Sequence, residues 1–366
     1  MYPFWSLPGP GSFVESIIDD VRVGKNVVLR LPQFQPPGLE AVLRQKVSEE
    51  SWCWHPLRTT EHQLPLAELQ DRFQQSSTRY KRRDIQQLLD SSDFEGNVIW
   101  LGGIGGAEWV RWKPFIEEYQ HACRNKPESR RSLFIIPLSG EVAQHPPNQE
   151  ITLTIHSWCG SVSELDMIFY ATLLLKGSRL AEKQKLLLAT TVAKLSLWDP
   201  NMAERLARSQ INEILSPIGL LRKIAEERTW TDERAPNWQD GSLNRVDGIE
   251  QVHSAYLAAT DSKAVDARIW SAQISVIFPL LEEQRRNILL RIQNQHQVPI
   301  KMGETIIDNL WDLELGQLAY FLKYNKHPLY PSAARLHRIR NSLAHLENLP
   351  PEEAFARELY VPLSSA

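Results

Sequence analysis

The segment at residues 333–347, AARLHRIRNSLAHLE, decides how the C-terminal part of this 366-residue chain is interpreted. Four apolar residues recur in it every three or four positions: Leu336, Ile339, Leu343 and Leu346. At about 100° per residue these side chains form a single stripe, so the spacing predicts an amphipathic helix that packs against a core.

Polar residues occupy the other side of this expected helix. His345 and Asn341 lie roughly opposite the centre of the apolar stripe, and Arg340 lies on its flank. We therefore expect His345 to face solvent or a second protomer instead of the interior of its own domain.

The six residues at 340–345, RNSLAH, resemble the RNxxxH form of the RxxxxH motif of HEPN ribonucleases. The preceding segment LWDLELGQLAYFL is similar to the long helix before that motif, and the resemblance spans roughly residues 255–355. It implies a small all-helical bundle that commonly dimerises, with the motif on a late helix at the dimer cleft. An exposed Arg and His surface in an unrelated helical bundle is the alternative interpretation.

The resemblance also implies a chemistry, which is RNA cleavage without a metal ion. Because imidazole exchanges protons near neutral pH, His345 is expected to act as general acid or base while a 2′-hydroxyl attacks the adjacent phosphate. Arg340 is expected to hold the phosphate oxygens, and Asn341 to orient the imidazole or bind the phosphate. The expected product ends in a 2′,3′-cyclic phosphate. His337 and Arg338 lie near the same polar side, where they either contact RNA or are simply solvated.

Three helices are predicted for the C-terminal domain, which we place at residues 251–366. The first covers about residues 264–292 and is bent or split at Pro279. The second covers about residues 304–323, and the third is the motif helix at 333–347.

The N-terminal part alternates between strand and helix patterns. A helix is expected at residues 12–23, with Ser12 as its cap, and another begins near residue 39. Short apolar runs predict strands at 26–31, 97–101, 132–136 and 150–156. Strands separated by helices predict a three-layer α/β domain with a mostly parallel sheet, at residues 1–160.

The loop after the first strand, LPQFQPPGLEA, lies where a P-loop NTPase binds phosphate, yet it lacks the signature GxxxxGK[ST]. The strand at 97–101 ends in Gly102 and Gly103 instead of an acidic metal ligand. The layout resembles a degenerate AAA or STAND-type NTPase that has lost nucleotide chemistry. An unrelated α/β domain is one alternative, and a nucleotide-dependent regulator that binds ATP is another.

Residues 161–250 are expected to form a bridge between these two domains. The pattern is helical from about residue 163 to 228, and residues 229–250 are rich in Asp, Asn, Gly and Pro, which is typical of an exposed linker or loop.

Composition adds few constraints. The net charge is −3 and the pI about 6.4, so any nucleic-acid site has to be a local basic surface. Three scattered cysteines predict neither disulfides nor a zinc site, and we predict no metal and no cofactor. No signal peptide and no apolar run of membrane-spanning length is visible, so a cytoplasmic protein without a membrane partner is expected.

Two functions remain in view. The first is an endoribonuclease of a bacterial defence or toxin type, with RNA as substrate, a homodimer formed through the C-terminal domain and a possible partner protein at the N-terminal domain. The second is a non-catalytic dimerising scaffold or regulatory subunit of a defence complex.

Overall fold

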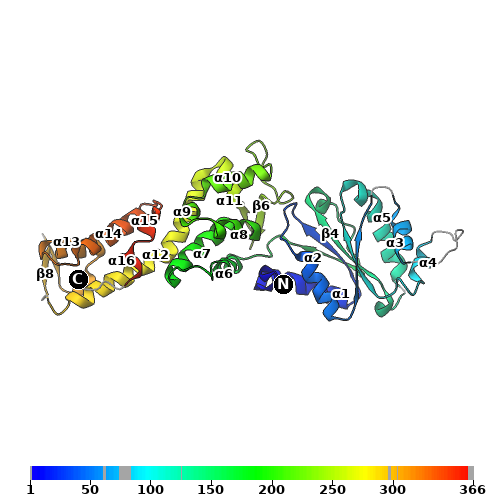
Figure 1. Ribbon diagram of the computed structural model, residues 1–366, viewed down its shortest axis with the longest axis horizontal. Coiled ribbons are helices and arrows are strands. Elements are labelled where there is room, and N and C mark those ends of the chain that lie inside the picture. Colours follow the sequence, from blue (N-terminus) through cyan, green and yellow to red (C-terminus); the bar gives the residue numbers. More distant parts are fainter. Residues whose placement is uncertain are drawn as a thin grey trace. The chain divides into compact units, whose positions relative to one another are not determined.

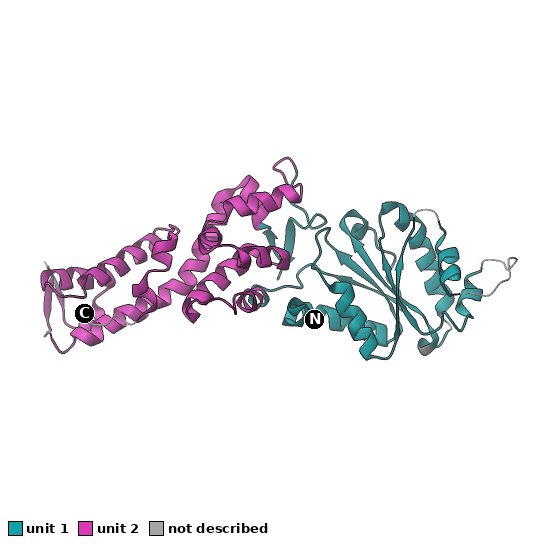
Figure 2. Ribbon diagram, in the orientation of Figure 1, with its two compact units in different colours: residues 1–166, 234–253 teal, residues 167–233, 254–366 magenta. Residues whose placement is uncertain are grey.

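The computed structural model describes residues 2–60, 63–73, 84–124, 126–295, 298–302 and 304–361. The chain forms two compact units (Figure 2), of which unit 1 contains Met1–Asp166 and Arg234–His253. Unit 2 contains Met167–Glu233 and Ser254–Ala366. This division differs from the expected three parts at 1–160, 161–250 and 251–366, because the bridge residues are shared between the two units.

Unit 1 is built on a five-stranded parallel sheet with the order β2-β3-β4-β1-β5. Its strands are β1 (Asn26–Leu31), β2 (Cys53–Arg58), β3 (Asn97–Gly102), β4 (Leu133–Ser139) and β5 (Leu153–Ser157). The predicted mixed α/β domain is thus confirmed, and the four predicted strands are present within a few residues. The central strands are buried on both faces, which is why they read as continuous apolar runs.

Strand β2 was not predicted from the sequence. It lies at the edge of the sheet, where most of its side chains are partly or fully exposed, and it contains Pro56. Proline lacks a backbone donor and is tolerated on an edge strand, so this strand has neither the apolar run nor the composition of a central one.

Helices cover both faces of this sheet (Figure 1). One face carries α1 (Pro8–Arg22) and α2 (Leu39–Glu49), and the other carries α3 (Pro65–Phe73), α4 (Ile85–Leu89) and α5 (Gly106–Cys123). Between the sheet and the face that carries α3, α4 and α5 lies an aromatic core that includes Trp112, Tyr119 and Phe134.

Helix α1 starts four residues earlier than expected. Leu7 is its N-cap and Pro8 its first residue, so Ser12 lies inside the helix and caps nothing. The fixed φ of proline is pre-organised for the first helical position, and this preference outweighs the capping pattern that begins at Ser12.

The exposed linker or loop expected at 229–250 is confirmed only in part, because residues 231–242 are turns and loop, with 231–235 exposed, but the segment from Arg234 onward belongs to unit 1. Residues 243–252 form a hairpin of β6 (Leu243–Val246) and β7 (Ile249–Val252), and the segment before it packs on unit 1. Asp240 accepts hydrogen bonds from the backbone N–H of Ser242 and the amide of Asn237. These turn residues therefore bond to one another and fix a packed loop, although their composition is that of an exposed one.

Unit 2 is almost entirely helical, as predicted. Its first part contains α6 (Glu164–Leu174) from Met167 onward, α7 (Glu182–Ser196), α8 (Pro200–Arg208), α9 (Ile211–Leu215), α10 (Ile218–Glu227) and α11 (Ser254–Thr260). Its second part contains α12 (Ser262–Ile292), α13 (Leu315–Tyr324), α14 (Tyr330–Ala344), α15 (Pro351–Ala354) and α16 (Arg357–Tyr360). Helix α12 contacts α7, α14 and α16 and so forms the spine of this unit.

Two expectations about the C-terminal helices need correction. Helix α12 continues through Pro279 as one element, so the alternative that it is split there is wrong, whereas the alternative of a bend stays a prediction. The expected helix at 304–323 begins only at Leu315, because the residues before it form a hairpin of β8 (Ile300–Met302) and β9 (Thr305–Ile307) and the short 3-10 helix η4 (Leu310–Asp312). The side chain of Asn309 caps η4 by accepting the backbone N–H of Trp311, which separates this turn from α13.

In the part of the chain that the structure describes, α12 is the one helix long and apolar enough to span a membrane by length and composition. Such helices also form the cores of soluble domains. Buried residues recur along its length, among them Val265, Ile269, Ile277 and Ile288, and the neighbouring helices of unit 2 account for this apolar face.

Candidate functional site

Helix α14 buries one stripe and leaves the opposite side open. Ala333, Leu336, Ile339 and Leu343 are buried. Leu346, the last expected member of this stripe, is instead 70% exposed, because α14 ends at Ala344 and Leu346 has a left-handed backbone with φ of 63°.

The end of α14 is a Schellman turn. The backbone N–H of Glu347 donates to the carbonyl of Ser342 at 2.9 Å, and that of Leu346 donates to Leu343 at 3.2 Å. Glycine usually occupies the left-handed position of this turn, and a leucine there costs roughly 1–2 kcal/mol. Backbone strain of this kind gathers at functional sites, and here it lies directly beside His345.

Polar side chains connect α14 with the start of α13. An amide N–H of Asn341 lies 3.1 Å from Nε2 of His337, and Arg340 donates to Oδ1 of Asn341 at 3.4 Å. The guanidinium of Arg340 also lies 4.0 Å from a carboxylate oxygen of Glu314. Arg340, Asn341 and His337 are therefore brought together, each of them half-buried.

Two of the predicted site residues stand apart from this cluster. His345 is the C-cap residue of α14, and its backbone N–H donates to the carbonyl of Asn341 at 2.9 Å. Its side chain is exposed, as is that of Arg338. Among the described residues, no hydrogen bond or ion pair engages the imidazole of His345.

Two participants were missed at the sequence level. Glu314 approaches Arg340 from the N-cap of α13, and Gly316 lets α13 come close to His337. A β-carbon at Gly316 would lie 2.9 Å from Nε2 of His337, which is too close. A glycine inside an otherwise helical pattern was the available signal, since it often marks such an approach.

The second candidate region is the carboxyl end of β1 in unit 1. Strands β1 and β4 lie side by side, and the chain leaves them toward opposite faces of the sheet. From β1 it passes to α2, and from β4 to the short helix η3 (Gly140–Gln144), which packs in the same core as α5. Ligands of open α/β sheets bind at such a switch point.

Side chains and backbone of unit 1 itself occupy this switch point. The backbone N–H of Gln33, in the loop after β1, donates to the carbonyl of Gln239 at 2.8 Å. The guanidinium of Arg30 lies 5.6 Å from the ring centre of Trp238, and its Nε donates to the carbonyl of Ala143. The packed segment before β6 thus covers the loop.

The other side of the same loop is tied to the N-terminus. The indole N–H of Trp5 donates to the carbonyl of Pro37 at 2.8 Å. Gly38, with φ of 82°, is the N-cap of α2 and packs beside the same indole. A phosphate-binding loop needs free backbone N–H groups and a lysine, whereas this loop has no lysine and the backbone N–H of Gln33 is already bonded to Gln239.

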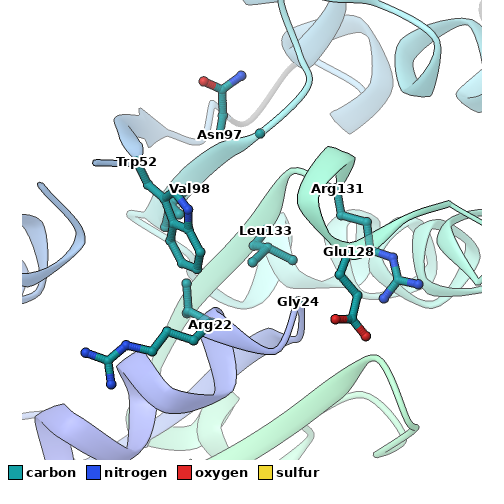
Figure 3. A pocket seen from close by; sticks show the side chains of 10 residues that line it. Arg22, Gly24, Trp52, Asn97, Val98, Glu128, Arg131 and Leu133 are labelled. Atoms are coloured by element: carbon teal, nitrogen blue, oxygen red, sulfur yellow. The ribbon is translucent and has the colours of Figure 1, made fainter. Parts of the chain in front are cut away.

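A cavity of about 320 Å³ opens at the opposite edge of the sheet, near the first residues of β3 and β4 (Figure 3). Arg22, Trp52, Glu128 and Arg131 contribute to its lining. Arg22 is already paired with Asp19 and Glu50, and Arg131 donates to two backbone carbonyls. The charged groups of this cavity are therefore largely satisfied by the protein itself.

Metal-binding groups are not a feature of either candidate region. Within the described ranges, no three His, Cys, Asp or Glu side chains gather in a way that could hold a metal ion.

No family model matches the chain, and no curated protein matches it. Among solved structures, the chain is similar to the RuvB Holliday junction branch migration motor of Thermotoga maritima, at 13% identity and a TM-score of 0.34. That match covers 68% of this chain and 90% of the motor. Two mutant forms of the motor match at 12% identity and a TM-score of 0.33. These scores are too low to carry an argument, and the strand order remains the observation that defines the fold of unit 1.

Proposed function

We propose that the chain is a metal-independent endoribonuclease whose active site lies on α14. The observation that carries this proposal is the side of α14 that faces away from its apolar stripe. There Arg340, Asn341 and His337 form a hydrogen-bonded cluster, and His345 stands exposed one helical turn after Asn341. A strained Leu346 fixes the end of the helix next to that imidazole.

The proposed reaction is an internal transesterification of RNA. The 2′-oxygen attacks the adjacent phosphorus, the bond from phosphorus to the 5′-oxygen breaks, and the products end in a 2′,3′-cyclic phosphate and a 5′-hydroxyl. His345 takes the proton from the 2′-hydroxyl or gives one to the leaving oxygen. Arg340 binds the non-bridging oxygens, on which negative charge builds up in the transition state.

Asn341 and His337 have supporting roles in this proposal. Asn341 spans the cluster, since its amide reaches His337 and its carbonyl oxygen accepts from Arg340. It would therefore orient Arg340. A homodimer formed through this face would place two copies of His345 and Arg340 along one shared groove, so that one imidazole serves as base and the other as acid.

For unit 1 we propose a degenerate P-loop-like domain that docks a partner protein instead of hydrolysing a nucleotide. Its support is the parallel sheet, with β1 followed by a loop and α2 at the switch point, together with the closure of that loop by residues of unit 1. A defence or toxin setting in the cytoplasm remains a prediction from the HEPN resemblance.

The test is cleavage of end-labelled single-stranded RNA by the purified full chain in the presence of EDTA. We expect cyclic-phosphate ends from the wild type and their loss in His345→Ala. His121→Ala, which removes an exposed histidine from unit 1, is the matched control and should cleave normally. Cleavage that persists in His345→Ala rules the mechanism out. A wild type that dimerises without cutting any RNA favours the second function, the non-catalytic scaffold.

A further inference from the structure

Positive charge is concentrated on α13 and α14. Residues 315–346 contain no Asp or Glu, although the whole chain has 44 acidic and 41 basic residues. Five basic residues lie in this span: Lys323, Lys326, Arg335, Arg338 and Arg340. Arg335 is paired with Glu358, and Arg340 has Glu314 nearby. Lys323, Lys326 and Arg338 form no ion pair with any described residue, so their charges are available to a polyanion.

Two tyrosines stand out from the same surface. Tyr320 is 59% exposed and Tyr324 is 80% exposed, and they lie four residues apart on α13. Side chains at this spacing are neighbours on a helix, at about 5–6 Å. Lys323 is exposed beside them. Exposed aromatic rings interleaved with lysines form the stacking surface that single-stranded nucleic acids use.

Gly316 connects these tyrosines with the cluster on α14. The β-carbon direction of Gly316 points at Nε2 of His337, at a distance of 2.9 Å. Tyr320 follows one turn later, and its side chain leaves the helix about 40° from the direction of Gly316. A continuous row therefore runs from His337 past Gly316 to Tyr320 and Tyr324.

We propose that single-stranded RNA lies along the exposed face of α13. Its bases stack on Tyr320 and Tyr324, and its phosphates lie near Lys323 and Arg338, so that the strand leads to Arg340. The identity of the ligand as RNA rests on the proposed function, whereas the binding surface itself rests on the rings and charges described above. Duplex RNA does not fit, because its bases are already stacked and paired and cannot cover the two rings.

The experiment measures binding apart from cleavage. Fluorescence anisotropy of a labelled 12-nucleotide RNA is recorded with full-length His345→Ala protein, which leaves the probe intact. Tyr320→Ala and Tyr324→Ala should each weaken binding about fivefold or more, and Tyr320→Phe should bind normally. Phe169→Ala, which removes an exposed ring from α6, is the control and should have no effect. Lys323→Gln and Arg338→Gln should each reduce the slope of log Kd against log salt by about 0.7.

The possible outcomes separate this inference from the nuclease proposal. Binding that depends on both tyrosines, without cleavage by the wild type, supports the RNA surface and removes the nuclease. Cleavage that depends on His345, with binding unchanged in both alanine variants, overturns the RNA surface alone. Equal binding of single-stranded DNA supports it, because stacking and phosphate contacts do not read the 2′-hydroxyl. Equal binding of duplex RNA overturns it.

Discussion

The carboxyl end of β1 in unit 1 and the surface of α13 and α14 in unit 2 differ in what occupies them. At the end of β1, the backbone of Gln239 and the ring of Trp238 fill the position where open α/β sheets bind ligands. On α14, Arg340 and Asn341 bond to each other and His345 remains exposed. Of the two regions, only the surface of α13 and α14 leaves groups that can take part in a reaction accessible to a ligand.

If the proposed function holds, the fold of unit 1 and the active site of the chain lie in different units. Unit 1 has a parallel sheet with a switch point, and its own residues occupy the crevice there. This arrangement suits a structural or docking role. The exposed groups on α14 contribute little to packing, since the helix is held by its apolar stripe and by the indole of Trp270, which donates to the carbonyl of Leu343 at 2.8 Å. Substitutions on α14 should therefore change RNA cleavage and leave stability unchanged, whereas substitutions at the end of β1 should change stability and leave cleavage unchanged.

The largest expected effect is on RNA cleavage by Arg340 variants. Arg340→Ala should lower the cleavage rate roughly 10²–10³-fold, as removal of one charge-stabilising donor does, with little change in the midpoint of urea unfolding. Arg340→Lys should recover only part of the rate, because lysine lacks the planar fork that binds two phosphate oxygens. The rates come from gel quantification of end-labelled RNA. Full activity in Arg340→Ala would show that the cluster of Arg340, Asn341 and His337 has only a structural role, like the residues that occupy the end of β1.

The next largest effect is on stability, in unit 1. Trp238→Ala removes a partly buried ring from the core beside β1 and should lower the free energy of unfolding by about 2 kcal/mol, measured by urea denaturation. RNA cleavage should be unchanged.

The same variant tests whether the switch point accepts a nucleotide. Calorimetric titration with ATP and Mg²⁺ should show no binding for the wild type or for Trp238→Ala, since opening the crevice restores neither a lysine nor the missing glycines. Binding by the wild type would contradict the closed loop and support a nucleotide-dependent regulator.

The predictable part of the fold is the part that local sequence determines. The strand at 26–31 and a helix beginning near Leu39 were predicted and are confirmed, because a run buried on both faces and a helix after a Pro/Gly loop have strong local patterns. Strand β2 was missed because an edge strand needs no such pattern. The packing of the loop around Trp238 was not predicted, since its partners lie some 200 residues earlier in the chain.

The candidate site divides in the same way. The helical spacing placed Arg340 on the flank of the apolar stripe and His345 on the open side, and the structure has them half-buried and exposed respectively. Glu314 and Gly316 could not be assigned, because their roles depend on how α13 packs against α14. The exposure of Leu346 depends on where α14 ends, and the apolar periodicity continues past that point.

A smaller effect is expected at the end of α14. Leu346→Gly should raise the free energy of unfolding by about 1 kcal/mol, because glycine adopts the left-handed conformation at no steric cost and the leucine side chain buries little surface. Leu346→Ala keeps the β-carbon and should give no such gain. Equal stability of the two variants in urea denaturation would show that the turn next to His345 is not strained.

A last effect, of similar size, concerns a histidine of unit 1 that, unlike His345, lies within hydrogen-bond distance of a carboxylate. Nε2 of His156 lies 2.7 Å from Asp20, and Lys25 lies 2.9 Å from the other oxygen of that carboxylate. Burial raises the pKa of Asp20, but these hydrogen bonds and charges outweigh it and hold the pKa below its ordinary value.

Because the pKa of Asp20 is lowered in the folded state, its contribution to stability is present above the ordinary pKa, near 4, and is lost as the pH falls through the folded value. Asp20→Asn should therefore lower the free energy of unfolding by about 1 kcal/mol at pH 7 and by much less at pH 3, in urea denaturation at the two pH values. RNA cleavage at pH 7 should not change. A stability loss that is the same at both pH values would show that the Asp20 carboxylate contributes through packing and not through its charge.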